Sequence, residues 1–122
     1  MVTCIVVDDD VNTTKVFSDI LGIMGLDVVG KGFSGSEAVC LYKQHRPDVV
    51  FLDLMMPKTD GFYAIKKIRE IDPTSKIVAV TANLTLEVDQ KLKELKISAI
   101  IHKPFSILEV KQALEIYKIN AL

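Results

Sequence analysis

The sequence lacks tryptophan, long apolar runs and any large excess of one charge. Its apolar stretches fall well short of the roughly 18 residues that a membrane-spanning helix requires, although the mean hydropathy is +0.30. The opening residues, MVTCIVVDDD, have no basic lead and turn acidic after seven residues, unlike a secretory signal peptide. We therefore expect no membrane segment, and the cytoplasm is the expected location.

The charges are nearly balanced, with 15 basic and 16 acidic side chains and a net charge of −1. This balance argues against a surface that coats nucleic acid, so we expect no direct nucleic-acid binding. Hydrophobic residues make up 49% and charged residues 25% of the chain, an ordinary proportion for a globular protein. Because 122 residues are enough to bury one core, residues 1–122 are predicted to form a single domain.

Cysteine is scarce, and its two positions do not suggest a metal site. Cys4 and Cys40 lie in apolar stretches and lack the spacing of metal ligands. We interpret both as small core residues in a reducing compartment. The chain also shows no internal repeat, low-complexity tract or linker.

Short runs rich in valine and isoleucine alternate with amphipathic stretches along the chain. Apart from Asp27 at the start of one run, the runs are apolar without alternation, as expected of strands covered on both faces. The predicted strands span residues 4–7, 27–30, 49–52, 77–80 and 99–101. This alternation predicts an α/β fold with a parallel sheet and helices on both faces. Five units favour the doubly wound, flavodoxin-like strand order 2-1-3-4-5 over a six-stranded Rossmann sheet.

The stretches between the strands carry recognisable helix ends. Ser34 with Glu37, and Ser106 with Glu109, have the spacing of a capping box, and Asp10 is a candidate cap for the first helix. Residues typical of helix stops follow the first three helices. These stops are Gly25, Pro47 and Pro73. Apolar side chains at three- and four-residue steps predict one buried stripe on the last helix. This stripe consists of Ile107, Val110, Leu114 and Tyr117.

Ionisable or hydroxyl side chains follow four of the five predicted strands. They are Asp8, Asp9 and Asp10 after the first strand, Asp53 after the third, Thr81 after the fourth and Lys103 after the fifth. The strand order places the carboxyl ends of the first and third strands side by side, where such folds bind ligands. The sequence therefore predicts a cluster of carboxylates near one hydroxyl and one ammonium.

Such a cluster needs a positive charge. At a separation of 4 Å, two carboxylates repel by about 4 kcal/mol near a protein surface, and Lys103 alone cannot neutralise three of them. Oxygen ligands suit Mg²⁺, with Mn²⁺ as an alternative. Zinc is disfavoured because no histidine or cysteine is suitably spaced.

A divalent ion beside a carboxylate also suits phosphoryl transfer, whose transition state needs positioning and charge neutralisation. An aspartate can be the nucleophile and hold the phosphoryl group. In this interpretation Asp53 attacks, and Asp8 and Asp9 hold the metal ion. Lys103 and the Thr81 hydroxyl then contact the phosphoryl oxygens.

Four strings together carry a family resemblance: IVVDD, VVFLDLMMPKTDG, VAVTA and HKPF. In this order and spacing, and over essentially the whole chain, they resemble the receiver domain of two-component response regulators. The resemblance implies a switch that accepts a phosphoryl group from a sensor histidine kinase or a phosphotransfer protein. It also implies self-phosphorylation and self-dephosphorylation rather than a metabolic reaction, and is compatible with a dimer formed on phosphorylation. Both a free-standing regulator and a receiver joined to an output domain fit it.

The resemblance assigns roles residue by residue. It implies that Asp53 is the phospho-acceptor, Asp8 and Asp9 the acidic pair, Thr81 the switch hydroxyl and Lys103 the phosphate-binding lysine. It further implies that the Met55 backbone carbonyl completes the metal site and that a cis peptide bond precedes Pro104.

The chain departs from the family pattern at three positions. Ile100 stands where the family usually has an aromatic residue coupled to the threonine, so the aromatic readout is absent. Met55 and Asn83 lie two places after Asp53 and Thr81, where family side chains tune dephosphorylation. Met55 cannot position water by hydrogen bonding.

Other functions and simpler roles stand beside this interpretation. A haloacid-dehalogenase-type phosphohydrolase would need a second aspartate at position 55, which is Met55. A flavodoxin-like cofactor binder would need a glycine-rich loop after the first strand, and aspartates stand there. A phosphorylation-independent interaction scaffold remains an alternative. Asp8 and Asp9 could be a charge cluster at a helix start, and Asp10 is interpreted as the cap.

Several further residues receive structural interpretations. His45 and His102 are not expected to carry phosphohistidine chemistry, since His102 has no orienting acid nearby in sequence. Asp60-Gly61 is interpreted as a helix entry, and Met55-Met56 as core and loop packing. Leu84 and Leu86 are expected in the core, with an exposed partner-docking role as the alternative.

Overall fold

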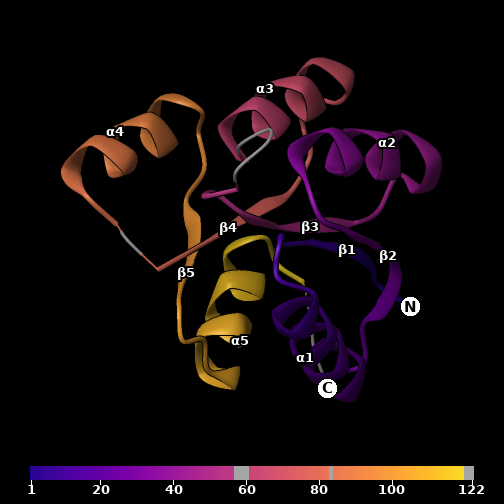
Figure 1. Ribbon diagram of the computed structural model, residues 1–122. Coiled ribbons are helices and arrows are strands. Elements are labelled where there is room, and N and C mark those ends of the chain that lie inside the picture. Colours follow the sequence, from indigo (N-terminus) through magenta and orange to yellow (C-terminus); the bar gives the residue numbers. More distant parts are fainter. Residues whose placement is uncertain (57–60, 83, 120–122) are drawn as a thin grey trace.

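The structure, a computed structural model, describes residues 1–56, 61–82 and 84–119. Within these residues, five strands form one parallel sheet in the order β2-β1-β3-β4-β5 (Figure 1), which confirms the predicted strand order. The strands are β1 (Thr3–Val7), β2 (Asp27–Gly32), β3 (Val49–Asp53), β4 (Ile77–Thr81) and β5 (Ala99–His102). Each strand contains its predicted run and extends it by one or two residues.

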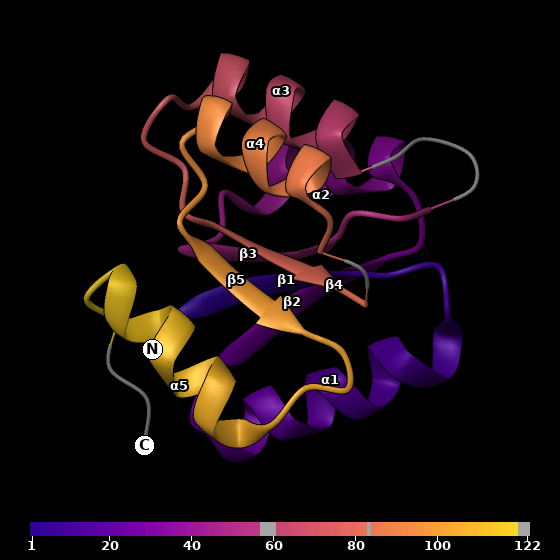
Figure 2. The ribbon, with the colours of Figure 1, turned by 90° about the vertical axis from the view of Figure 1, so that its left-hand side faces the viewer.

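Helices cover both faces of the sheet, as predicted. They are α1 (Val11–Ile23), α2 (Gly35–His45), α3 (Gly61–Ile71), α4 (Leu86–Glu94) and α5 (Ile107–Ile116). Figure 2 shows α1 and α5 on one face, and α2, α3 and α4 on the other. Each of the four neighbouring strand pairs is parallel. The carboxyl ends of the strands therefore share one edge of the sheet.

Two apolar clusters, one on each face, hold the layers together. Along β1, Cys4 and Val6 pack in the cluster with α1 and α5, whereas Ile5 and Val7 pack in the cluster with α2 and α3. Because successive side chains of a strand point to opposite faces, a strand buried on both faces must be apolar at every position. This explains why the runs lack polar alternation.

The predicted helix caps are confirmed. Asp10 accepts hydrogen bonds from the backbone amides of Asn12 and Thr13 at the start of α1. Ser34 and Ser106 cap α2 and α5, each accepting from the amide three residues ahead. Gly25 follows α1 with a φ of 91°, a conformation that glycine adopts at little cost.

Some burial predictions were wrong. Cys40 is exposed, because the face of α2 that packs inward carries Ala38 and Tyr42, and position 40 lies on the opposite side of the helical turn. In the predicted α5 stripe, Val110 and Leu114 are buried, but Ile107 in the first turn is 52% exposed.

The methionine pair and the leucines also differ from expectation. Met56 packs in the core, whereas the Met55 side chain is 60% exposed. Leu84 and Leu86 are both exposed rather than in the core. Within the described ranges, no helix is long and apolar enough to cross a bilayer.

Candidate functional site

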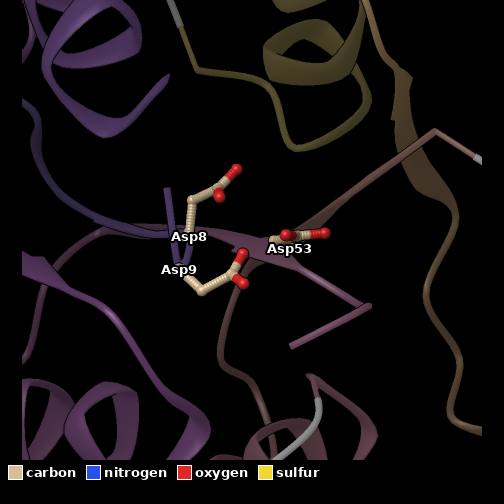
Figure 3. Close-up of side chains that lie close together, drawn as sticks. All are labelled: Asp8, Asp9 and Asp53. Atoms are coloured by element: carbon tan, nitrogen blue, oxygen red, sulfur yellow. The ribbon is translucent and has the colours of Figure 1, made fainter. Parts of the chain in front are cut away.

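Three aspartates meet where β1 and β3 end side by side. Val7 and Leu52 are paired in the sheet, so the next residues, Asp8 and Asp53, emerge next to each other. Asp8, Asp9 and Asp53 each place a carboxylate oxygen within 4.8 Å of the others, and Figure 3 shows the three side chains close together. The predicted carboxylate cluster is therefore present in the fold.

The cluster combines burial with like charge. Asp8 and Asp53 are 5% and 4% exposed, and Asp9 is exposed. Burial, followed by the negative charge of Asp8, raises the pKa of Asp53 above its usual value. Lys103 and the Met55 amide act in the opposite direction on this pKa. The ionised form of Asp53 is therefore disfavoured by the loss of water and by the neighbouring negative charge, both of which a nearby cation would offset.

Lys103 supplies part of the missing charge. Its ammonium Nζ lies 2.6 Å from Oδ2 of Asp8 and 3.3 Å from Oδ2 of Asp53. Burial alone would lower the pKa of Lys103, but the hydrogen bond to Asp8 and the charges of both aspartates raise it. The lysine therefore stays protonated between the two carboxylates.

The remaining oxygens of the buried pair are oriented by nearby backbone amides. Asp8 Oδ1 accepts from the amide of Asp10 at 2.9 Å, and Asp53 Oδ1 accepts from the amide of Met55 at 3.2 Å. One oxygen of each carboxylate is thus fixed locally, and the Oδ2 atoms face Lys103. Each carboxylate is thus held on one side by an amide two residues ahead and on the other by Lys103, from the distant loop after β5.

The loop after β5 brings Lys103 to the aspartates. In the sheet, β3 and β4 lie between β1 and β5, so this loop must turn back across the sheet edge. The Lys103 amide donates to the Thr81 carbonyl at 2.9 Å, and the predicted cis peptide bond before Pro104 is present. Phe105 then packs edge-on against Phe17 of α1, with ring centroids 4.5 Å apart.

Thr81 is the last residue of β4 and is fully buried. It is paired with His102 in the sheet, directly before Lys103. Ile100 lies within β5, partly buried against the cluster that contains α3 and α4 residues. Thr81 and Lys103 thus belong to one continuous edge of the sheet, as predicted.

The site fits a hard divalent cation. Its donors are carboxylate oxygens, two of them buried beside each other, and a single lysine does not balance three negative charges. Among the described residues, this is the group of acidic side chains close enough to hold a metal ion. The role of the Met55 carbonyl as a further ligand stays a prediction.

Some predictions concern residues away from the site or outside the described ranges. Asn83 and Asp60 lie outside the described residues. Gly61 begins α3, as expected of a helix entry, and its amide donates to the Leu54 carbonyl at 3.1 Å. His45 ends α2, and its ring lies beside Gly30 of β2.

The sequence reasoning missed an acidic partner of His102. Glu109 Oε2 lies 3.6 Å from Nδ1 of His102 and accepts a hydrogen bond from the His102 amide at 3.0 Å. In the sequence, Glu109 has only the signature of a capping box with Ser106. Its reach back to β5 could not be seen from the spacing.

Comparison with known proteins places the chain in a family. Residues 4–115 match the family described as the response regulator receiver domain. The probable C4-dicarboxylate response regulator DctR of Priestia megaterium is 32% identical over 117 residues, which cover 95% of this chain and 51% of that protein. Chemotaxis protein CheY of Thermotoga maritima is 40% identical over 78 residues, covering 64% of this chain and 65% of that protein.

A solved structure agrees with this assignment. A chain of the CheX–CheY–BeF₃–Mg²⁺ complex from Borrelia burgdorferi superposes with a TM-score of 0.89 at 28% identity, covering 95% of this chain and 89% of that one. The chain belongs to the response regulator receiver family and is a receiver domain of two-component signal transduction. The matched segments span about half to two thirds of the length of the two curated relatives.

Proposed function

We propose that this receiver switches state by accepting a phosphoryl group on Asp53, with Mg²⁺ held by Asp8, Asp9, Asp53 and the Met55 backbone carbonyl. The observation that carries the proposal is the meeting of three carboxylates with the Lys103 ammonium. In a purely structural ion pair, one carboxylate would balance the charge of one lysine, whereas three carboxylates lie together here. The excess negative charge at this edge instead suits a site completed by a cation and a phosphoryl group.

The reaction is a displacement at phosphorus. An Asp53 oxygen forms a bond to the phosphorus atom while the bond from phosphorus to the donor breaks, and the donor leaves with the electron pair. Bound Mg²⁺ would neutralise charge on the phosphoryl oxygens. The hydrogen bond from the Met55 amide to Asp53 Oδ1 orients the carboxylate, so that Oδ2 is the better-placed nucleophile.

Lys103 and Thr81 then contact the phosphoryl oxygens. The Lys103 ammonium already lies 3.3 Å from the proposed nucleophile, so a short movement pairs it with the incoming group. Thr81 ends the strand between β3 and β5, and its hydroxyl reports the phosphoryl group to the following segment. Since Ile100 replaces the usual aromatic residue, the response must travel through backbone and packing on α4, β5 and α5.

The proposed partners follow from this role. A sensor histidine kinase or a phosphotransfer protein donates the phosphoryl group in the cytoplasm, and residues 1–122 act as one receiver unit. The domain is a signal transducer whose only chemistry is at Asp53. A dimer formed on phosphorylation is compatible with the exposed face of α4 and α5.

Intact mass spectrometry tests the proposal. The protein is incubated with acetyl phosphate and Mg²⁺, beside Asp53→Asn, Asp10→Asn and a metal-free sample. We expect one phosphoryl adduct on the wild type and on Asp10→Asn, because Asp10 caps α1 and asparagine caps equally well. We expect none on Asp53→Asn or without metal. An adduct that persists in Asp53→Asn, or no adduct under any condition, would contradict the proposal; the second result favours a phosphorylation-independent scaffold.

A further inference from the structure

Lys103 stands in a short loop that leaves an edge strand. Within the part of the chain that the structure describes, β5 has only β4 as its neighbour in the sheet, so its amides that point away from β4 face no other described strand. The Lys103 amide points inward and donates to the Thr81 carbonyl. The amide before it, that of His102, points the other way and donates to Glu109 Oε2 at 3.0 Å.

Glu109 lies in the first turn of α5, seven residues beyond His102. Its own amide donates to the Ser106 hydroxyl at 3.2 Å, which begins the helix. The carboxylate therefore bridges the two ends of the loop: α5 on one side and the last residue of β5 on the other. Because the acceptor is charged, this hydrogen bond is stronger than a neutral one.

The same motif at the start of α2 shows that the bridge is particular to α5. There Glu37 accepts from the hydroxyl of Ser34 at 3.2 Å, within its own capping box. Both motifs read Ser-x-x-Glu, and both serines cap their helices. The α5 glutamate also reaches out of its helix to the strand that leads to the site.

The loop that carries Lys103 is held by three contacts. The Thr81 carbonyl accepts from the Lys103 amide, and Phe105 packs on Phe17. Glu109 completes the set by accepting from the His102 amide at the end of β5. The ammonium must lie within hydrogen-bond reach of Asp8 and Asp53, which come from β1 and β3. Because the lysine side chain is long, a small rotation of the backbone at His102 would displace the Lys103 ammonium from the two carboxylates.

We propose that Glu109 is a positioning residue that sets Lys103 for phosphoryl transfer by holding the His102 amide. The inference rests on the proposed function, because it assigns Lys103 to the phosphoryl oxygens. Glu109 touches neither the phosphoryl group nor the metal ion in this scheme. It acts through the backbone, and the exposed imidazole of His102 at 3.6 Å is secondary.

The test measures the rate of phosphorylation by acetyl phosphate at saturating Mg²⁺, together with the Mg²⁺ dissociation constant. Glu109→Ala should lower the rate by about tenfold, as small misplacements of reacting groups do. Its Mg²⁺ affinity should stay unchanged, since the ligands come from β1 and β3. Glu109→Gln keeps an oxygen that can accept from the His102 amide and should restore most of the rate. Glu37→Ala, the matched change in α2, should leave the rate unchanged.

A double-mutant cycle separates positioning from a loss of helix stability. If Glu109 acts through Lys103, Glu109→Ala should have no further effect on the rate in a Lys103→Ala background. Hydrogen exchange of the His102 amide, followed by NMR, should accelerate in Glu109→Ala and stay slow in Glu109→Gln.

Two results would overturn the inference while the proposed function stands. These are an unchanged phosphorylation rate in Glu109→Ala, or an equal loss with and without Lys103. Absence of an adduct on the wild type would overturn the proposed function itself, and the inference with it.

Discussion

Lys103 and Asp8 are 95 residues apart in the chain, and their charged groups lie 2.6 Å apart. The pair closes the site from the side of β5, because the loop after that strand turns back over β4 and β3. Asp53 shares the same ammonium at 3.3 Å. One cation thus offsets the repulsion of two buried carboxylates, and this balance leads to the first prediction.

Removal of Lys103 should destabilise the metal-free protein. Lys103→Ala leaves the buried Asp8 and Asp53 without the ammonium that both of them contact. Loss of one partner from a fully buried pair costs about 3–5 kcal/mol; because Lys103 is 23% exposed, we expect about 1–3 kcal/mol here. Urea unfolding measures the loss, and saturating Mg²⁺ should recover part of it.

A surface lysine provides the control for this change. Lys93 pairs with Asp89 at 3.1 Å on α4, with 76% of its side chain exposed. Lys93→Ala should change the unfolding free energy by less than about 0.5 kcal/mol. Equal losses in the two variants would show that the aspartate cluster does not depend on the lysine charge.

Magnesium should stabilise the fold through Asp9. A ligand that binds only the native state adds about 2.7 kcal/mol at 100 times its dissociation constant. Asp9→Asn should reduce this Mg²⁺-dependent gain by about 1.4 kcal/mol or more, equivalent to a tenfold loss of affinity. Thermal or urea unfolding with and without Mg²⁺ measures it.

Asp10 is the matched control, since it is the neighbouring aspartate but caps α1. Asp10→Asn should keep the full Mg²⁺ gain. If the Mg²⁺-dependent gain were lost in Asp10→Asn and kept in Asp9→Asn, Asp10 rather than Asp9 would be the metal ligand.

Much of the fold and site could be predicted because they depend on patterns local to each strand. The continuous apolar run before Asp53 reports burial on both faces, and the residue that ends each run lies at the carboxyl edge. The sequence therefore predicts that one edge of the sheet carries Asp8, Asp53, Thr81 and Lys103. It does not predict that the Lys103 ammonium contacts both carboxylates.

The wrong burial predictions and the missed Glu109 contact depend on which side of a helix or loop faces its neighbour. Cys40 has apolar residues on both sides in sequence, but the inward face of α2 is fixed by Ala38 and Tyr42. Met55 lies between Leu54 and Met56, which are both buried, but its own side chain is turned outward and is 60% exposed. Glu109 fits a capping box in sequence, and only the turn of the loop brings the end of β5 within its reach.

Gly61 should be intolerant of a side chain. A Cβ atom there would meet the backbone oxygen of Asp53 at 2.6 Å and the Cα atom of Leu54 at 2.7 Å. Since these backbone atoms belong to Asp53, the proposed phospho-acceptor at the end of β3, and to the residue after it, Gly61→Ala must shift α3 or Asp53. We expect a loss of about 1–3 kcal/mol in the unfolding free energy and slower phosphorylation.

Gly22 in α1 is the matched glycine, because a Cβ atom there would have no neighbour within 4 Å among the described residues. Gly22→Ala should stabilise the protein by about 0.5–1 kcal/mol through helix propensity and leave phosphorylation unchanged. A tolerated Gly61→Ala would mean that α3 can move away from β3 without cost.

The two cysteines should differ in reactivity. Cys40 is exposed on α2, whereas Cys4 is fully buried in β1, and burial is the main cause that raises its pKa to about 12. Since the thiolate is the reactive form, one equivalent of a thiol reagent should react with the native protein at pH 8, at Cys40. Peptide mapping identifies the site, and Cys40→Ser should abolish the native reaction. Rapid native labelling of Cys4 would contradict the buried position of β1.

The same thiol should make the protein less stable in alkali. In the unfolded chain Cys4 ionises near its ordinary pKa of 9.0, but in the fold its pKa is about 12. Between these values the native state binds more protons than the unfolded state, so stability falls as the pH rises, by up to about 1.4 kcal/mol per pH unit.

Cys4→Ala removes this contribution and keeps that of Tyr42, whose pKa is also raised to about 12 by burial and by Asp72. The unfolding free energy of the wild type should therefore fall more steeply than that of Cys4→Ala from pH 9 upward; parallel curves would show that the Cys4 thiol ionises as readily in the fold as in the unfolded chain.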